Sequence, residues 1–91
     1  MSKITVEQPS AEQLTSLDVD NWPIWTKEVS EFPWTYSSQE IAYILEGEVS
    51  VKPTDGGAAV SFKAGDLVTF ESGLSCTWQV KKALRKHYHF S

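Results

Sequence analysis

Short apolar or alternating runs, bounded by turns that contain glycine, fill the chain from about residue 40 to its end. The turn glycines are Gly47, Gly56, Gly65 and Gly73, spaced nine, nine and eight residues apart. The runs are Ile41 to Leu45, Glu48 to Lys52, Ala59 to Lys63, Leu67 to Phe70, Ser75 to Val80 and Leu84 to Phe90. Short strands at such regular spacing, with no helical pattern between them, predict an all-β sandwich or small barrel.

Alternation within these runs predicts which side chains face the interior. In a strand, every second residue lies on the same face, so Cys76, Trp78 and Val80 share one face, which we expect to be buried. In the last run, Arg85, His87 and His89 take the outer face, and the inner face goes to Leu84, Lys86, Tyr88 and Phe90. The predicted inner face of the barrel includes Tyr43, Leu45, Val49, Phe62, Leu67, Phe70, Trp78 and Tyr88.

The N-terminal part of the chain has a different pattern. Ser10 can cap a helix, Gln13 stands three residues later, and Leu14 and Leu17 give that helix a short apolar edge. The segment 18–23 breaks this pattern, and strand-forming residues begin after Pro23. The 91 residues predict one domain, with an arm and a short helix over 1–21 and a barrel over 22–91. We expect the first ten or so residues to be loosely tethered.

Composition and charge narrow the class of protein. With one cysteine the chain cannot form an internal disulfide, and it has no apolar run long enough to span a membrane, so we expect a soluble, cytoplasmic protein. Residues 1–80 carry four lysines against twelve acidic residues, and the four basic residues of 81–91 follow this acidic body. The basic cluster has no nucleic-acid motif around it, which favours a solvated strand face or salt bridges over nucleic-acid binding.

Two stretches resemble a known superfamily. Residues 40–49 (EIAYILEGEV) and 64–73 (AGDLVTFESG) resemble the two motifs of the cupin superfamily. This resemblance implies a single cupin-type barrel, that is, a double-stranded β-helix or jelly roll. Further segments look like the stand-alone single-cupin proteins related to the ureidoglycine aminohydrolase cupin domain. They are Trp22 to Trp25, the Trp34 and Tyr36 pair, Gly73 to Trp78 and Arg85 to Tyr88.

The resemblance also implies where a metal would bind, and this chain departs from that pattern. Cupins usually hold a metal with two histidines and a glutamate from the first motif and one histidine from the second. Here Glu40 matches the glutamate, Trp34 and Tyr36 stand where the histidine pair would be, and Cys76 replaces the last histidine. We therefore expect no metal or other cofactor. His87 and His89 have a spacing that suits a metal, but they stand at the wrong end of the chain.

The candidate chemistry lies on the positions that the resemblance and the alternation turn inward. Glu40 and Cys76 are the candidate catalytic residues, since a carboxylate in an apolar barrel can exchange a proton and a thiol can react. The expected pocket wall is Trp34, Tyr36, Glu40, Cys76 and Trp78. The alternatives stay open that Glu40 is a structural carboxylate, that Cys76 packs as a small apolar group, and that the aromatic residues fill the barrel.

The sequence thus favours a small cupin that binds or converts a small polar metabolite in its barrel. Whether it catalyses a reaction is left open. One alternative is a non-catalytic module whose exposed strands pair in a homodimer. Another is a metal-dependent enzyme, similar to the aminohydrolase, with unusual ligands. Changing Glu40 to glutamine is expected to abolish binding of a cationic or proton-donating ligand while leaving the thermal stability nearly unchanged.

Overall fold

A computed structural model describes residues 4–90 of the chain. Its elements, in chain order, are β1 (Ile4–Glu7), α1 (Ala11–Leu17), the 3-10 helix η1 (Val19–Asn21), β2 (Ile24–Lys27), β3 (Ser30–Thr35), β4 (Glu40–Pro53), β5 (Val60–Lys63), β6 (Leu67–Phe70) and β7 (Ser75–Phe90). Strands dominate, and every pairing between them is antiparallel. The prediction of an all-β fold with a short N-terminal helix is confirmed.

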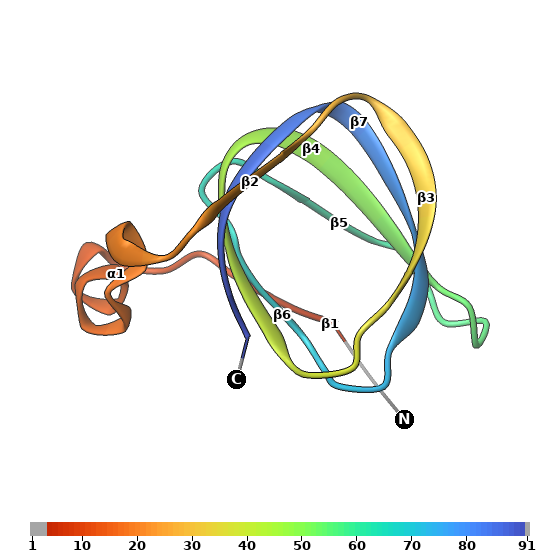
Figure 1. Ribbon diagram of the computed structural model, residues 1–91, viewed down its shortest axis with the longest axis horizontal. Coiled ribbons are helices and arrows are strands. Elements are labelled where there is room, and N and C mark those ends of the chain that lie inside the picture. Colours follow the sequence, from red (N-terminus) through yellow and green to blue (C-terminus); the bar gives the residue numbers. More distant parts are fainter. Residues whose placement is uncertain (1–3, 91) are drawn as a thin grey trace.

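Two long strands form the centre of the sheet. β4 pairs with β5, β6 and β7, while β7 pairs with β2, β3 and β4. The main path of the sheet runs β1-β6-β4-β7-β2. Viewed along the shortest axis of the molecule, the strands curl around a common interior (Figure 1). The side chains that point into this barrel from β3, β4 and β7 therefore meet one another.

The sequence pattern misplaced one turn. Gly47 was expected to end a strand, but β4 continues through it with a φ of 107°, and the pairing of β4 with β7 shifts register on both sides. A Cβ atom at this position would lie 2.6 Å from the carbonyl oxygen of Ala83 on β7. Only glycine fits this irregular crossing, because it combines a positive φ with no side chain.

The irregularity around Gly47 changes which residues of β4 face inward. Ala42 and Ile44 are buried before it, whereas Val49 and Val51 are buried after it, so the inner face passes from even to odd positions. The prediction that Tyr43 and Leu45 face inward is therefore wrong, and both side chains are half-buried. The predicted burial is confirmed for Val49, Phe62, Leu67, Phe70 and Trp78, while Tyr88 is half-buried.

Aromatic rings form much of the core. Phe70 stacks on Tyr36 with ring centroids 4.9 Å apart, and its ring lies 5.5 Å from Trp78. Phe62 packs edge-on against both Phe70 and Trp78. Around these rings the core is aliphatic, with Val49, Val51, Val68 and Val80 all buried. This arrangement fills one part of the barrel and leaves the space beyond Trp78 to a different set of residues.

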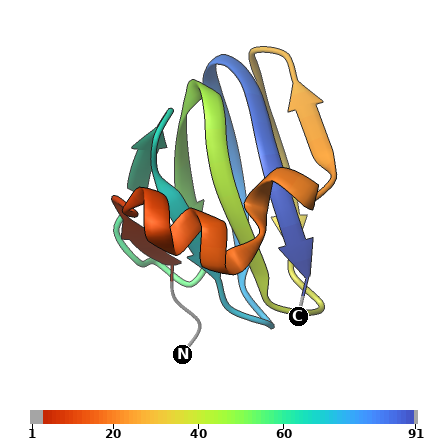
Figure 2. The ribbon, with the colours of Figure 1, turned by 90° about the vertical axis from the view of Figure 1, so that its left-hand side faces the viewer.

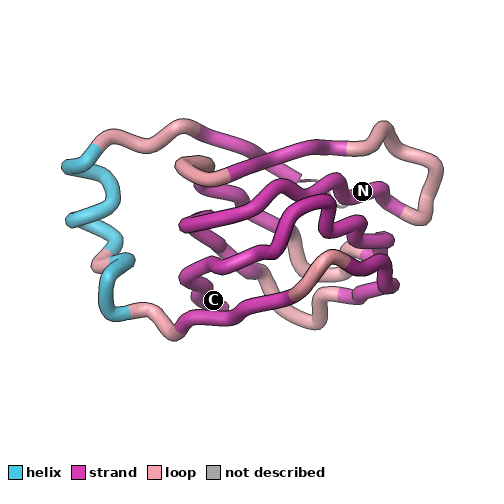
Figure 3. Tube along the Cα trace, turned by 90° about the horizontal axis from the view of Figure 1, so that it is seen from above, coloured by secondary structure: helices cyan, strands magenta, loops and turns pink. Residues whose placement is uncertain are grey.

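The helices of the N-terminal segment lie outside the barrel, while its strand β1 belongs to the sheet. Ser10 caps α1 as expected, since its Oγ accepts a hydrogen bond of 3.1 Å from the Gln13 amide. Figures 2 and 3 show α1 and η1 outside the ring of strands. The expected loose arm is wrong for residues 4–7, because β1 pairs with β6 from Ile4 to Glu7; residues 1–3 lie outside the described residues. Neither helix in the described part of the chain is long and apolar enough to cross a membrane.

Candidate functional site

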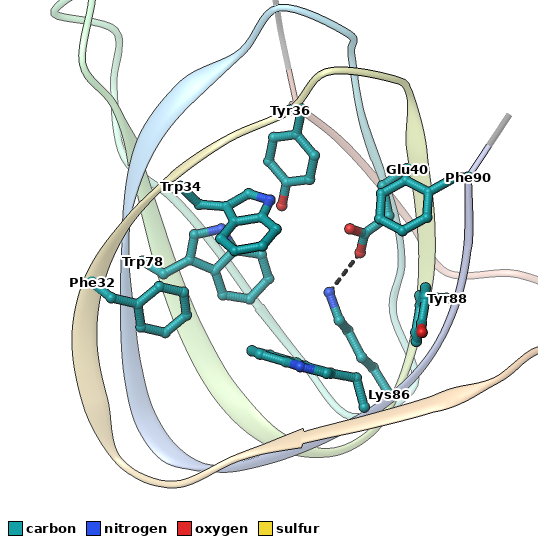
Figure 4. A pocket seen from close by; sticks show the side chains of 9 residues that line it. Phe32, Trp34, Tyr36, Glu40, Trp78, Lys86, Tyr88 and Phe90 are labelled. Atoms are coloured by element: carbon teal, nitrogen blue, oxygen red, sulfur yellow. Dashed lines mark hydrogen bonds and ion pairs between the residues drawn. The ribbon is translucent and has the colours of Figure 1, made fainter.

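A cavity of about 190 Å³ lies inside the barrel (Figure 4). β3 contributes Phe32 and Trp34, which face inward together because they are two positions apart. The full wall is Trp25, Phe32, Trp34, Tyr36, Glu40, Trp78, Lys86, Tyr88 and Phe90. Trp34 and Phe90 are each nearly half exposed, at 46% and 47%. They therefore mark the side on which the cavity meets solvent.

An ion pair lies on the wall of this cavity. The Lys86 ammonium donates to Oε2 of Glu40 over 2.5 Å, and the two side chains are only 6% and 4% exposed. In the register of β4 and β7, Lys86 faces Ile44 while Glu40 faces Phe90, so the lysine side chain extends along the interior to reach the carboxylate. The other carboxylate oxygen is turned toward the cavity (Figure 4). One oxygen of Glu40 thus holds Lys86 and the other faces the space a ligand would fill.

Two indole rings hold the lysine from its sides. Lys86 Nζ lies 4.8 Å from the ring centroid of Trp78 and 5.1 Å from that of Trp25. Burial lowers the pKa of Lys86, because the ammonium loses its water shell, and the charge of Glu40 opposes this by favouring the protonated form. The rings add cation–π attraction for that same charged form. The protonation state of Lys86 is therefore a balance between burial and the groups that face it.

Two further polar atoms of the wall have no partner. Tyr36 Oη and Trp78 Nε1 are both buried and make no hydrogen bond within the described residues. Burial, followed by the nearby charge of Glu40, raises the pKa of Tyr36 far above its ordinary value and outweighs the opposite effect of the neighbouring Trp78 N–H, so the phenol keeps its proton. Both atoms are therefore hydrogen-bond donors. A buried donor without a partner costs roughly 1 to 3 kcal/mol, which a bound molecule with an acceptor atom would recover.

The structure places four of the five expected pocket residues on the cavity wall: Trp34, Tyr36, Glu40 and Trp78. Cys76 is not among the lining residues. Its Sγ donates instead to the carbonyl oxygen of Trp34, 3.6 Å away, because the two residues are register partners on β7 and β3. Burial raises the pKa of the Cys76 thiol, with the charge of Glu40 adding to the effect. A protonated thiol outside the cavity lacks the reactivity expected of a catalytic cysteine.

Sequence reasoning assigned no role to Lys86, which the structure makes the partner of Glu40. The signal was present, since the alternation of the last strand placed Lys86 on the same inner face as Leu84, and a lysine there needs a counter-charge. Trp25 and Phe32 were also missed because their short strands precede the regular part of the pattern. Tyr88 and Phe90 were expected inside the barrel, without a place in the pocket, and both line the cavity.

The two histidines of β7 lie on the outer face of the barrel, where both contact Trp22. His87 is buried, and its Nδ1 donates to the carbonyl oxygen of Trp22 over 2.8 Å. His89 stacks on the Trp22 ring with a centroid distance of 5.3 Å. These contacts attach the segment before β2 to β7. The two side chains therefore have a structural role on the face away from the cavity.

The wall does not fit the metal that the superfamily resemblance implies. Oε2 of Glu40 already accepts from an ammonium group, so a divalent cation beside it would face the repulsion of Lys86. Trp34 offers no ligand atom, because an indole nitrogen only donates a hydrogen bond. Across residues 4–90, no three histidine, cysteine, aspartate or glutamate side chains come close enough to hold an ion.

The fold is that of a small cupin. Residues 14–88 match the family model described as the EutQ-like cupin domain, Cupin_3, so the chain belongs to that family. A DUF861 family protein from Thermotoga maritima is 48% identical, with a TM-score of 0.95 over 98% of this chain and 100% of that one. No curated protein matches this chain.

Two larger relatives share the fold. The EutQ protein of Clostridium difficile is 24% identical with a TM-score of 0.66, over 74% of this chain and 52% of its own. A putative ethanolamine utilization protein Q from Salmonella typhimurium is 25% identical with a TM-score of 0.65, over 96% of this chain and 68% of its own. Their names describe those proteins. For this chain the comparisons establish the family and the fold.

Proposed function

We propose that this cupin binds a small polar metabolite in the barrel cavity, with Glu40 and Lys86 orienting it. One observation carries the proposal: a buried ion pair and two unpartnered donors line the same aromatic cavity. Buried polar groups are costly, and proteins seldom leave them around an empty space without a use for them. A compact ligand would satisfy them together.

The lining restricts the chemistry of the ligand. A volume of about 190 Å³ suits a small molecule, since an engineered protein cavity of about 150 Å³ already binds benzene. The donors on Tyr36 and Trp78 require an acceptor such as a carbonyl or carboxylate oxygen. The free oxygen of Glu40 accepts from an N–H or O–H, and the flat rings of Phe32 and Trp34 favour a planar group.

Three compound classes meet these requirements in part. Small carboxylates match Lys86, and ureides combine an acceptor with N–H donors, in line with the resemblance to the ureidoglycine aminohydrolase cupin domain. Small amines match Glu40, and the Salmonella relative is described as a putative ethanolamine utilization protein. We therefore propose these three classes, with ethanolamine among the amines, as the first compounds to test.

A thermal-shift screen followed by calorimetric titration tests the proposal. We compare the parent with Tyr36→Phe, which removes one unpartnered donor, and with Tyr43→Phe, which removes a hydroxyl on the opposite face of β4. A ligand of the cavity should bind Tyr43→Phe as it binds the parent and bind Tyr36→Phe about tenfold more weakly, or about 1.4 kcal/mol. The proposal fails if no compound of the three classes binds, or if both variants bind equally well.

A second candidate, a non-catalytic module that forms a homodimer, is favoured by the strand β2 and the turn after it. β2 pairs only with β7 among the described strands, and the apolar residues Ile24 and Val29 are 45% and 63% exposed. An open strand edge beside apolar side chains can pair with a second copy. Light scattering of the parent and of Val29→Glu tests this, since a dimer through this edge would dissociate in the variant.

A further inference from the structure

We propose that Lys86 forms a covalent imine with a small aldehyde or ketone bound in the cavity. This inference rests on the proposed function, since it requires the cavity to take a ligand, and it names the substrate class. The observation behind it is the position of one amine. Lys86 Nζ lines the cavity, a carboxylate lies 2.5 Å from it, and two donors without partners lie on the same wall.

The first requirement of imine formation is a free amine, and the wall provides a way to produce one. The Lys86 ammonium can transfer a proton to Oε2 of Glu40, its direct hydrogen-bond partner. Transfer converts the ion pair into a neutral amine and a neutral acid, a state that burial favours because neither group then needs hydration. Burial also lowers the pKa of Lys86, which favours the neutral amine, and the charge of Glu40 opposes this effect without cancelling it.

The second requirement is a site for the carbonyl oxygen. As the amine attacks the carbonyl carbon, negative charge develops on that oxygen and must be stabilised. Tyr36 Oη and Trp78 Nε1 are buried donors with no other partner in the described part of the chain, and both belong to residues of the cavity wall. They suit this role because they are held in place before the reaction begins.

The bonds and protons of the reaction balance without any further reagent. The nitrogen of Lys86 forms a bond to the carbonyl carbon, and the resulting carbinolamine loses its oxygen as water. The proton that Glu40 accepted from the ammonium returns to the leaving hydroxyl, so Glu40 acts first as base and then as acid. The products are an iminium group on Lys86, a Glu40 carboxylate and one water molecule, with no net oxidation or reduction.

The surroundings of Lys86 also suit the product. An iminium group is a cation, like the ammonium that it replaces, so it keeps the attraction of Glu40 and of the Trp25 and Trp78 rings. The Lys86 side chain is only 6% exposed, which limits the access of the water that would hydrolyse the imine. Among the described residues, the second Lys–Glu pair between β4 and β7, Lys82 with Glu48, has side chains 72% and 45% exposed and lacks this environment.

Reductive trapping tests the proposal. We incubate the protein with propanal and cyanoborohydride near neutral pH, where exposed lysines are protonated, and locate the propyl label by peptide mass spectrometry. Lys82 is the internal control. Because burial lowers the pKa of Lys86 and so leaves more of it as free amine, and because two donors of the wall can activate the carbonyl, we expect Lys86 to be labelled at least about tenfold faster than the exposed Lys82. Lys86→Arg should lose this fast label, and Tyr36→Phe should slow it at Lys86 alone.

The outcomes separate this inference from the proposed function. If Lys86 is labelled no faster than Lys82 in the parent, the inference is wrong, and this result needs no variant to fold. If cavity ligands still bind in calorimetry while Lys86 stays unlabelled, only the imine is excluded and the proposed function stands. If Lys86 is labelled quickly but Tyr36→Phe is labelled at the parent rate, the placement of the carbonyl oxygen is wrong.

Discussion

Two lysine–glutamate pairs join β4 to β7, and they have the same chemical groups but differ in burial and in the distance between their charges. The inner pair, Lys86 with Glu40, is held over 2.5 Å with both side chains at most 6% exposed. The outer pair, Lys82 with Glu48, is 3.1 Å apart with side chains 72% and 45% exposed. The irregular crossing at Gly47 lies between them along β4. One pair of strands thus presents the same two groups to water at one point and to an aromatic interior at another.

The difference shows what burial adds to an ion pair. In water, each charge of the outer pair is well solvated, so pairing changes the free energy of unfolding little. In the interior, Glu40 and Lys86 have only each other and the surrounding rings, so loss of either leaves an uncompensated charge. A pair of this kind is weak evidence for stability but good evidence for a site, since the same position filled by apolar residues would be cheaper to bury.

Opening the wall around the inner pair should have the largest effect. Trp78 is 2% exposed, contacts Phe62 and Phe70, and covers one side of Lys86. We expect Trp78→Ala to lower the free energy of unfolding by about 3 to 5 kcal/mol, the usual range for a large core residue. Trp34→Ala, at a site 46% exposed, is the control and should cost much less. Urea unfolding measures both, and similar losses would show that Trp78 does not anchor the core.

Removing one charge from each pair tests the comparison directly. Glu40→Gln leaves the Lys86 ammonium buried without a counter-charge, so we expect a loss of about 3 kcal/mol or more in the free energy of unfolding at neutral pH. Glu48→Gln should cost less than about 1 kcal/mol. This expectation differs from the one drawn from the sequence, that Glu40→Gln leaves stability nearly unchanged, because the structure pairs Glu40 with the buried Lys86. Equal losses in the two variants would remove the distinction between the pairs.

Replacing both members of the inner pair should have a smaller effect than replacing one. A double variant, Glu40→Leu with Lys86→Met, fills the same space with apolar groups and leaves no charge unpaired. We expect its stability to equal or exceed that of the parent, as found for buried pairs replaced by apolar residues. The variant should at the same time lose ligand binding and the fast propyl label. A double variant as unstable as Glu40→Gln would instead give the pair a role in folding.

The sequence predicted the fold better than it predicted the site. Regular turns and alternation were sufficient to predict an all-β barrel. The alternation also predicted correctly that Trp78 and Val80 of β7 are buried. The alternation failed at Gly47, because a glycine that marks a turn and one that allows an irregular strand crossing have the same local signature. Because of that error, Tyr43 was assigned to the inner face of β4, which Ile44 occupies.

The site was predicted only in part, for a reason of a different kind. Four wall residues came from alternation and from motif position, but the partner of Glu40 lies 46 residues away. No local sequence pattern relates two residues at that distance. Strand pairing would not have matched them either, because Glu40 lies opposite Phe90, four residues beyond Lys86. The lysine on an inward-facing position was a sign that a counter-charge was needed, and the interior of the barrel offered Glu40.

The smallest predicted effect is that of salt on the free energy of unfolding, and it should differ between the two pairs. Raising sodium chloride from about 0.1 M to about 1 M shortens the Debye length from about 10 Å to about 3 Å, which screens exposed charges much more than buried ones. The difference in unfolding free energy between the parent and Glu48→Gln, a few tenths of a kcal/mol at low salt, should therefore vanish at high salt. The difference between the parent and Glu40→Gln should persist, because little salt reaches groups that are 4% and 6% exposed. Comparing each variant with the parent at the same salt concentration cancels the general effect of salt on folding. If the Glu40→Gln difference also collapsed at high salt, the inner pair would be open to solvent in solution, and the argument for a buried, reactive Lys86 would fail with it.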